Sequence, residues 1–253
     1  MITMSQTFPP HAVSRLRSAR LERSTRPFLA RGGPSGERCA GCRLILSHCL
    51  CDLRSVVPTQ AGVCLLMAEH ETLKPSNTGW LIADVIPQTW AFGWARTTVE
   101  PALLALLADP QWQPYVVFPG EFVPPERVVS QLLPSQLVGE STVEKKPLFI
   151  LLDATWPEAR KIFKKSPYLN AFPVLSLAPE QVSRYRLRRS RRDDHLCTSE
   201  VAALCLALAG ETLAAQTMEA YLDVFTEHYL SAKQQRKIDR EDEVHQRLLA
   251  LRV

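Results

Sequence analysis

Four cysteines lie close together near the N-terminus of the chain, as Cys39, Cys42, Cys49 and Cys51. The first pair has the spacing of a zinc knuckle, and the second pair is tighter than usual, yet four thiolates can close a tetrahedron around one Zn²⁺. So short a segment lacks a core of its own, and bound metal would supply its folding energy. We predict a structural zinc site in preference to free buried thiols, with His48 as a substitute ligand that four cysteines make unnecessary.

A carboxylate stands at the end of an apolar run in the sequence FILLDATWPEARKIFKKSPYL, which spans 149–169. Ligands of open α/β sheets collect beyond the carboxyl ends of strands, and Asp153 occupies such an end. A buried charge is costly unless it is solvated or partnered, so Asp153 is predicted to be functional. Thr155 and Glu158 have the spacing of a capping box, so Thr155 also fits a plain helix cap, and Trp156 also fits plain packing.

Basic residues are concentrated in two places, although the net charge is only +4. Residues 1–52 contain eight arginines against three acids, and six of the nine residues in 184–192 are Arg. The helix expected after Asp153 adds Lys161, Lys164 and Lys165. Such clusters suit a polyanion, and together they favour RNA or DNA over a solvated face without a ligand.

The segments that must position these residues alternate between apolar strands and helices. Near-continuous apolar strands predict an α/β fold with a mainly parallel sheet. The expected strands are 62–68, 115–120, 147–153 and 172–177, and the expected helices are 11–24, 77–86, 101–109, 198–210 and 217–239, with a linker over 31–38. No GxGxxG or GxxxxGK[ST] phosphate loop is present.

The chain of 253 residues, 46% of them apolar, is long enough for one large domain with an appendage. No stretch approaches the roughly 20 apolar residues of a membrane span, and the N-terminus has no signal-peptide core. We therefore expect a cytoplasmic protein with no membrane association and no obligatory protein partner. In that setting Cys64, Cys197 and Cys205 are predicted to be core thiols and not part of a disulfide framework.

Six landmarks of one family occur in order along the chain. They are the cysteine cluster at 39–51, KPSNTGWLIADV at 74–85, VVFPG at 116–120, DATWPEARKIFKKSPYL at 153–169, YRLR at 185–188 and CTSEVA at 197–202. With these motifs the chain resembles the DTW-domain family over roughly residues 12–230, and within it the bacterial tRNA-uridine aminocarboxypropyltransferases. Ala154 departs from the commoner glycine, and the tail after Tyr229 is less covered by the resemblance.

The resemblance implies a SPOUT-like, knotted α/β fold and an enzyme that acts on tRNA. The reaction it implies moves the 3-amino-3-carboxypropyl group of S-adenosylmethionine to N3 of a uridine in the tRNA variable region and releases methylthioadenosine. Two alternatives stay open: a tRNA methyltransferase of similar fold that uses the same co-substrate, and a non-catalytic, zinc-containing RNA-binding factor. The expected division is a basic helix and zinc element over 1–55, a catalytic domain over 56–230 and a helical tail over 231–253.

The resemblance also implies roles for particular residues. Asp153 either takes the N3 proton as a general base or holds the amino group of S-adenosylmethionine. The turn over 77–79 suits a polar group of a ligand. The co-substrate would contact Phe118, Pro119, Gly120, Thr155, Trp156, Leu177, Leu187, Thr198 and Glu200. The tRNA would contact Lys161, Lys164, Arg184, Arg186, Arg188 and Arg189.

Overall fold

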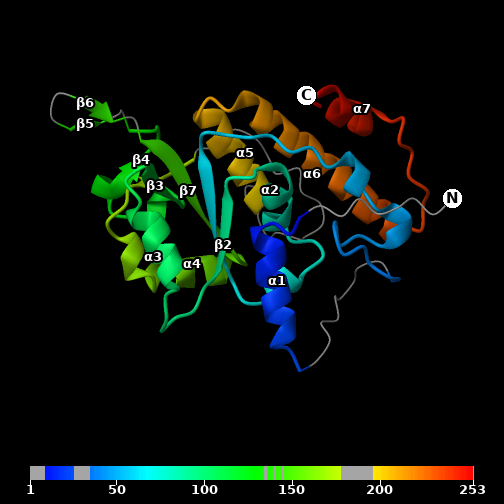
Figure 1. The fold of residues 1–253 in the computed structure, drawn as a ribbon, viewed down its shortest axis with the longest axis horizontal. Coiled ribbons are helices and arrows are strands. Elements are labelled where there is room, and N and C mark those ends of the chain that lie inside the picture. Colours follow the sequence, from blue (N-terminus) through cyan, green and yellow to red (C-terminus); the bar gives the residue numbers. More distant parts are fainter. Residues whose placement is uncertain are drawn as a thin grey trace.

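The computed structural model of the chain describes residues 9–25, 35–133, 136–138, 141–143, 145–177 and 196–252. Its centre is a six-stranded parallel sheet with the strand order β2-β1-β7-β3-β8-β4 (Figure 1). The strands are β1 (Gly62–Met67), β2 (Thr89–Gly93), β3 (Trp112–Val117), β4 (Val128–Val129), β7 (Lys146–Asp153) and β8 (Val174–Leu175). A separate antiparallel pair, β5 (Gln136–Val138) and β6 (Ser141–Val143), projects from one side. The predicted α/β fold with a parallel sheet is confirmed.

The central strands are apolar because helices cover both faces of the sheet. Every residue of β1 is buried, as are most of those in the second half of β7. Side chains alternate between the faces, so Leu65 and Phe149 enter one core while Leu66 and Ile150 enter the other. This two-sided burial is typical of parallel sheets and explains the uninterrupted apolar runs.

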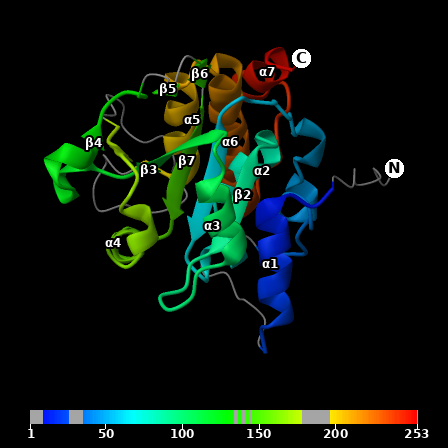
Figure 2. The ribbon, with the colours of Figure 1, turned by 60° about the vertical axis from the view of Figure 1, so that its left-hand side comes forward.

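The helices form two layers around this sheet (Figures 1 and 2). On one face the first core is completed by α2 (Gly79–Val85), α5 (Thr198–Leu208) and α6 (Thr212–Lys233). On the other face α3 (Pro101–Ala108) and α4 (Trp156–Lys164) cover the second core. The helix α1 (Ala12–Glu22) contacts β2 and α2, and α7 (Glu243–Ala250) packs on α6. Among the described residues, no helix combines the length and apolar character needed to span a membrane.

The sequence located the principal strands of the central sheet and missed β2 and β4 there, as well as the separate pair β5 and β6. The apolar runs predicted β1, β3, β7 and β8, although β8 is limited to two residues. In the two that belong to the central sheet, β2 and β4, several residues are only half-buried, so neither produces a continuous apolar pattern. Part of the predicted linker, 35–38, joins the cysteine segment through a β-bridge between Arg38 and Ile45.

The predicted helix over 217–239 was wrong at both ends, because α6 begins at Thr212 and ends at Lys233. Gln235 adopts a left-handed backbone with φ of 56°. Its N–H donates to the Ala232 carbonyl at 3.3 Å, and the Arg236 N–H donates to the Ser231 carbonyl at 2.8 Å. These two bonds form a Schellman motif, which usually has glycine at the left-handed position. The sequence has glutamine there, so it gave no signal that the helix stops.

This turn yields a stability prediction. Gln235→Gly should raise the free energy of unfolding by about 0.5–1 kcal/mol, because a side chain is strained in the left-handed region and the gain is partly offset by the extra freedom of unfolded glycine. Gln235→Val should lower it by about 1 kcal/mol, because a branched Cβ is worse there. Urea unfolding of the three proteins measures the order, and equal stability of the Val variant and the native chain would contradict it.

Candidate functional site

Asp153 ends β7 between the ends of β1 and β3, and its side chain is only 1% exposed. Its Oδ2 accepts a hydrogen bond from the side-chain amide of Asn77 at 2.6 Å. Its Oδ1 accepts a hydrogen bond from the hydroxyl of Thr198 at 2.6 Å. Bonds to an ionised acceptor are short and strong, so this carboxylate ties two distant segments to the end of a central strand.

Both tied segments open helices. Asn77 also accepts the Trp80 N–H at 3.0 Å through its side-chain oxygen, within the first turn of α2. Thr198 is the first residue of α5, and the preceding Cys197 N–H donates to the Glu200 carboxylate at 2.7 Å. The N-terminus of α5 therefore opens at the same edge of the sheet as Asp153, where unpaired N–H groups favour negative charge.

Gly79 is required by the closeness of these segments. A Cβ placed on Gly79 would lie 2.6 Å from Oδ2 of Asp153, well inside contact distance. The turn before α2 can approach the carboxylate only because position 79 has no side chain. The predicted turn over 77–79 is thus in direct contact with the predicted functional aspartate.

An aromatic cluster lies beside Asp153, where β3 ends and α4 begins. Phe118 stacks on Phe163 with ring centroids 4.4 Å apart and on Trp156 with centroids 5.5 Å apart. The ring of Phe118 is buried in this stack, whereas Trp156 and Phe163 on either side of it are half-buried. The Phe118 ring is therefore a buried support for two half-buried rings, one of which, Trp156, opens α4.

The predicted co-substrate residues converge on the carboxyl edge of the sheet as far as the structure describes them. The N–H of Gly120 donates to the hydroxyl of Ser176 at 2.9 Å, which joins the segment after β3 to the segment after β8 that contains Leu177. Thr155 is exposed and forms a capping box with Glu158, so its role as a helix cap is confirmed. The remaining predicted contacts, Leu187, Arg184, Arg186, Arg188 and Arg189, lie outside the described residues.

The basic face of α4 follows directly from this edge. Lys161 and Lys164 are exposed, as are Arg160 and Lys165. Two of these side chains lie over aromatic rings, with the Lys161 ammonium 5.8 Å from the Trp94 ring and the Arg160 guanidinium 4.7 Å from the Phe122 ring. The helix that begins beside Asp153 therefore presents positive charge to solvent.

The four cysteines of the N-terminal segment form a compact cluster. Their sulfur atoms all lie within 4.8 Å of one another. Hydrogen bonding with Cys42 lowers the pKa of the Cys39 thiol to about 6, and the same contact raises the pKa of Cys42. A cluster that favours a thiolate near neutral pH fits Zn²⁺, which binds the deprotonated form. Both ring nitrogens of His48 are engaged elsewhere, with the Ser47 hydroxyl and the Arg236 carbonyl.

Of the other three cysteines, two are in the core as predicted. Cys64 and Cys205 are fully buried, and burial raises the pKa of each thiol. Cys197 is half-buried, packs against the first core and is also the cap residue of α5. Its neighbour Ser199 lies 3.3 Å from its sulfur.

Arg43 is a residue whose role the sequence did not reveal. It lies inside the cysteine segment, is 3% exposed and has a left-handed φ of 67°. Its guanidinium donates to the carbonyls of Lys74 at 3.0 Å and Asn77 at 3.1 Å, and lies 4.3 Å above the Trp80 ring. Arg43 thereby connects the cysteine cluster to the turn that holds Asp153. The sequence showed only one more arginine in a basic region.

A family model for the DTW domain matches residues 36–230, and the chain therefore belongs to the DTW domain family. The match covers the cysteine cluster, the sheet and the edge around Asp153, and it confirms the resemblance found in the sequence.

A particular relative is the tRNA-uridine aminocarboxypropyltransferase 2 of Drosophila melanogaster, to which the chain is 37% identical over 59 residues. The alignment covers 23% of this chain and 24% of that protein, so the chain matches about a quarter of the curated relative. No solved structure matches the chain.

The cysteine cluster gives a metal prediction. Purified, reduced protein should contain about one Zn²⁺ per chain, as a closed site of four thiolates requires. Cys42→Ser should lose most of the metal, whereas Cys197→Ser should keep it, because serine is a good cap residue and Cys197 is not in the cluster. Elemental analysis of the three proteins measures this, and freshly prepared native protein without zinc would remove the site.

Arg43 gives a second prediction. Arg43→Lys should lower the free energy of unfolding by about 1–3 kcal/mol, because one ammonium cannot reproduce a planar fork and leaves a buried carbonyl without its donor. Arg15→Lys, at an exposed position of α1, should change it little. Urea unfolding measures both, with zinc content as the control that the cluster is intact. A native-like Arg43→Lys variant would show that the two carbonyls do not depend on this side chain.

Proposed function

We propose that this chain transfers the 3-amino-3-carboxypropyl group from S-adenosylmethionine to N3 of a uridine in the variable region of tRNA and releases methylthioadenosine. The observation that carries the proposal is the DTW family match over residues 36–230, which contains every described element of the edge around Asp153. The name of the Drosophila relative supports the same substrate and group. A SPOUT-like knotted chain path, the domain divisions at 55 and 230, and a cytoplasmic location are parts of this proposal.

The main task of the protein in this transfer reaction is to position the two substrates. S-adenosylmethionine supplies a sulfonium centre, so substitution at its aminocarboxypropyl carbon forms the N3–C bond, breaks the C–S bond and leaves neutral methylthioadenosine. The protein has to hold that carbon in line with N3 and to exclude other nucleophiles. The N3 proton has to leave, to a side chain or to water, before or during the substitution.

The carboxyl edge of the sheet has groups suited to the two ends of the co-substrate. The N-terminus of α5 offers N–H groups that favour a carboxylate, and the half-buried Thr198 lies between that turn and Asp153. Trp156 is a half-buried aromatic ring stacked on Phe118, the residue before Pro119 and Gly120, and an apolar, aromatic setting of this kind suits an adenine ring. We assign the amino-acid end to the Thr198–Glu200 turn and the adenosine to the segments after β3 and β8.

The contacts of Asp153 favour a role in fixing the site over a role in taking the proton. Both carboxylate oxygens already accept short hydrogen bonds, and the side chain is 1% exposed. To accept a proton from uridine, Asp153 would have to release Asn77 or Thr198 and become accessible. As a fixed anion it instead holds the turn of 77–79 and the start of α5 in one arrangement.

The tRNA would lie over the basic face of α4, beside the edge where the group is transferred. Lys161 and Lys164 are exposed there, and the arginines at 184, 186, 188 and 189 complete the proposed contact. Such contacts go to phosphates, so they position the tRNA and carry no sequence information by themselves.

The proposed function is tested by nucleoside mass spectrometry of tRNA from cells with and without this protein, together with transfer by the purified protein. We expect a protein-dependent gain of an aminocarboxypropyl group on uridine. A methyl gain would instead identify a methyltransferase. Binding of tRNA without any modification, unaffected by S-adenosylmethionine, would identify a non-catalytic factor.

Asp153→Asn separates the two roles of this residue. The asparagine oxygen can still accept from Asn77, and its amide can donate to the Thr198 hydroxyl, so the fold should survive with two weaker bonds in place of charge-assisted ones. We expect S-adenosylmethionine affinity to fall roughly tenfold, the effect of about 1.4 kcal/mol, while single-turnover transfer at saturating co-substrate stays within about tenfold of native. Calorimetry and rapid-quench transfer measure the two quantities.

The opposite pattern would contradict the fixing role. A general base predicts a loss of transfer of ~10²–10⁴-fold with unchanged affinity for the co-substrate. Asp153→Ala serves as the reference for a damaged site, because it leaves the Asn77 amide and the Thr198 hydroxyl without their acceptor.

A further inference from the structure

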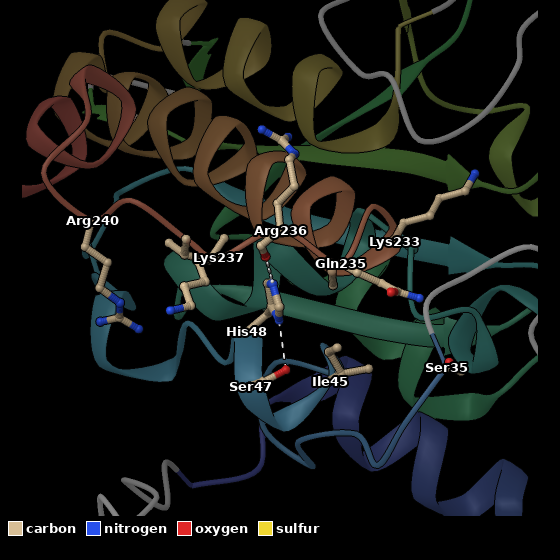
Figure 3. A pocket seen from close by; sticks show the side chains of 11 residues that line it. Ser35, Ile45, Ser47, His48, Lys233, Gln235, Arg236, Lys237 and Arg240 are labelled. Carbon is tan, nitrogen blue, oxygen red and sulfur yellow. Dashed lines mark hydrogen bonds between the residues drawn. The ribbon is translucent and has the colours of Figure 1, made fainter.

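We propose that a second RNA-binding surface lies away from the carboxyl edge, in a basic pocket between the cysteine element and the segment that follows α6, and that it binds backbone phosphates of the tRNA. The basic pocket has a volume of about 790 Å³ and is bounded by Ser47 and His48 on one side and by residues 232–240 on the other (Figure 3). The inference rests on the proposed function, since it assigns a further contact to the same substrate.

The charged side chains that line this pocket are all basic. They are Lys233, Arg236, Lys237 and Arg240, joined by the imidazole of His48. No acidic side chain lines the pocket within the part of the chain that the structure describes. A pocket lined by charges of one sign attracts anions, and the low dielectric constant of its walls strengthens the attraction.

Two of these cations are already held by the protein, and two are free to bind a ligand. Arg240 contacts the Asp52 carboxylate and donates to the Cys49 carbonyl at 3.0 Å, and Arg236 lies 3.5 Å from the Glu227 carboxylate. Lys233 and Lys237 are exposed and form no ion pair with a described residue. Figure 3 shows them on opposite sides of His48. The free charges are therefore spread along the pocket.

The backbone around the pocket is fixed in place. His48 is held between the Ser47 hydroxyl at 2.9 Å and the Arg236 carbonyl at 2.8 Å, and its own carbonyl lies 2.9 Å from the buried ring of His228. The left-handed Gln235 turns the chain at the end of α6, so that the following residues face the cysteine element. The pocket thus exists before a ligand arrives, which reduces the ordering cost of binding.

A polymer of phosphates fits this arrangement better than a single small anion. The two free lysines are separated across the pocket, so one ion would neutralise one of them, whereas successive phosphates of a strand can meet both. The cysteine element also connects the pocket to the edge, because His48 lines the pocket while Arg43 of the same element holds the turn of Asn77. A tRNA bound in the pocket would therefore be held by the element that also orders the Asp153 site.

The test compares a double variant of the pocket with a matched control. Lys233→Gln with Lys237→Gln removes both free charges, and Lys145→Gln with Lys146→Gln removes the same charge at the start of β7, the opposite end of that strand from Asp153. Binding of unmodified tRNA is measured over a range of salt concentrations, with calorimetry of S-adenosylmethionine for each protein.

The pocket variant should bind tRNA roughly tenfold more weakly at moderate salt, and the slope of log K against log salt should fall by about 2, since each phosphate contact contributes about 0.9 to it. Affinity for S-adenosylmethionine should not change, and the control should behave as native protein does. If the pocket variant keeps native affinity and slope while native protein binds and modifies tRNA, the pocket proposal is overturned and the proposed function stands. If native protein does not bind tRNA, both fall.

Discussion

The arrangement of the site depends on one buried carboxylate. A charge that is 1% exposed at the end of a central strand is stable only with donors held against it, and here these are the amide of Asn77 and the hydroxyl of Thr198. Position 79 is a glycine for the same reason, because a side chain there would collide with the Asp153 carboxylate. Three sequence motifs that are far apart in the chain are thus explained by one set of contacts. Asp153 makes the end of β7, the turn before α2 and the start of α5 a single unit.

The cysteine cluster belongs to the same unit through Arg43. An arginine in the left-handed region and almost fully buried would be unfavourable in an isolated loop. The four clustered sulfur atoms close the loop around this residue, and the two carbonyls that Arg43 reaches offset the desolvation of its guanidinium. The cysteine cluster therefore has a structural consequence beyond its own segment, because Arg43 holds the turn that carries Asn77. This explains why a domain with a large core of its own also has a cysteine element.

The sequence predicted what depends on composition and local pattern. Uninterrupted apolar runs predicted the strands β1, β3 and β7, and the Thr155–Glu158 spacing predicted the cap of α4. The partners of Asp153 could not be derived in this way, because they lie 76 and 45 residues from it and no local pattern links them. Arg43 and Gln235 were missed for another reason: each is a non-glycine residue in a left-handed conformation, which neither residue type signals. The strand β2 was missed because its residues are mostly half-buried or exposed.

Several arginines of the chain are structural, and this changes how the charge of the chain should be interpreted. Arg17, Arg43 and Arg54 face inward, where their guanidinium groups donate to backbone carbonyls at 2.8–3.1 Å. A planar fork with several donors suits such positions, whereas a lysine ammonium is a compact charge on a flexible stem. The described lysines of α4 and those at 233 and 237 are exposed. The arginine count of the N-terminal region therefore overstates the charge available to RNA. Exposed basic side chains suited to a polyanion lie on two separate elements, with Arg160, Lys161 and Lys164 on α4 and with Lys233 and Lys237 at the end of α6 and just after it.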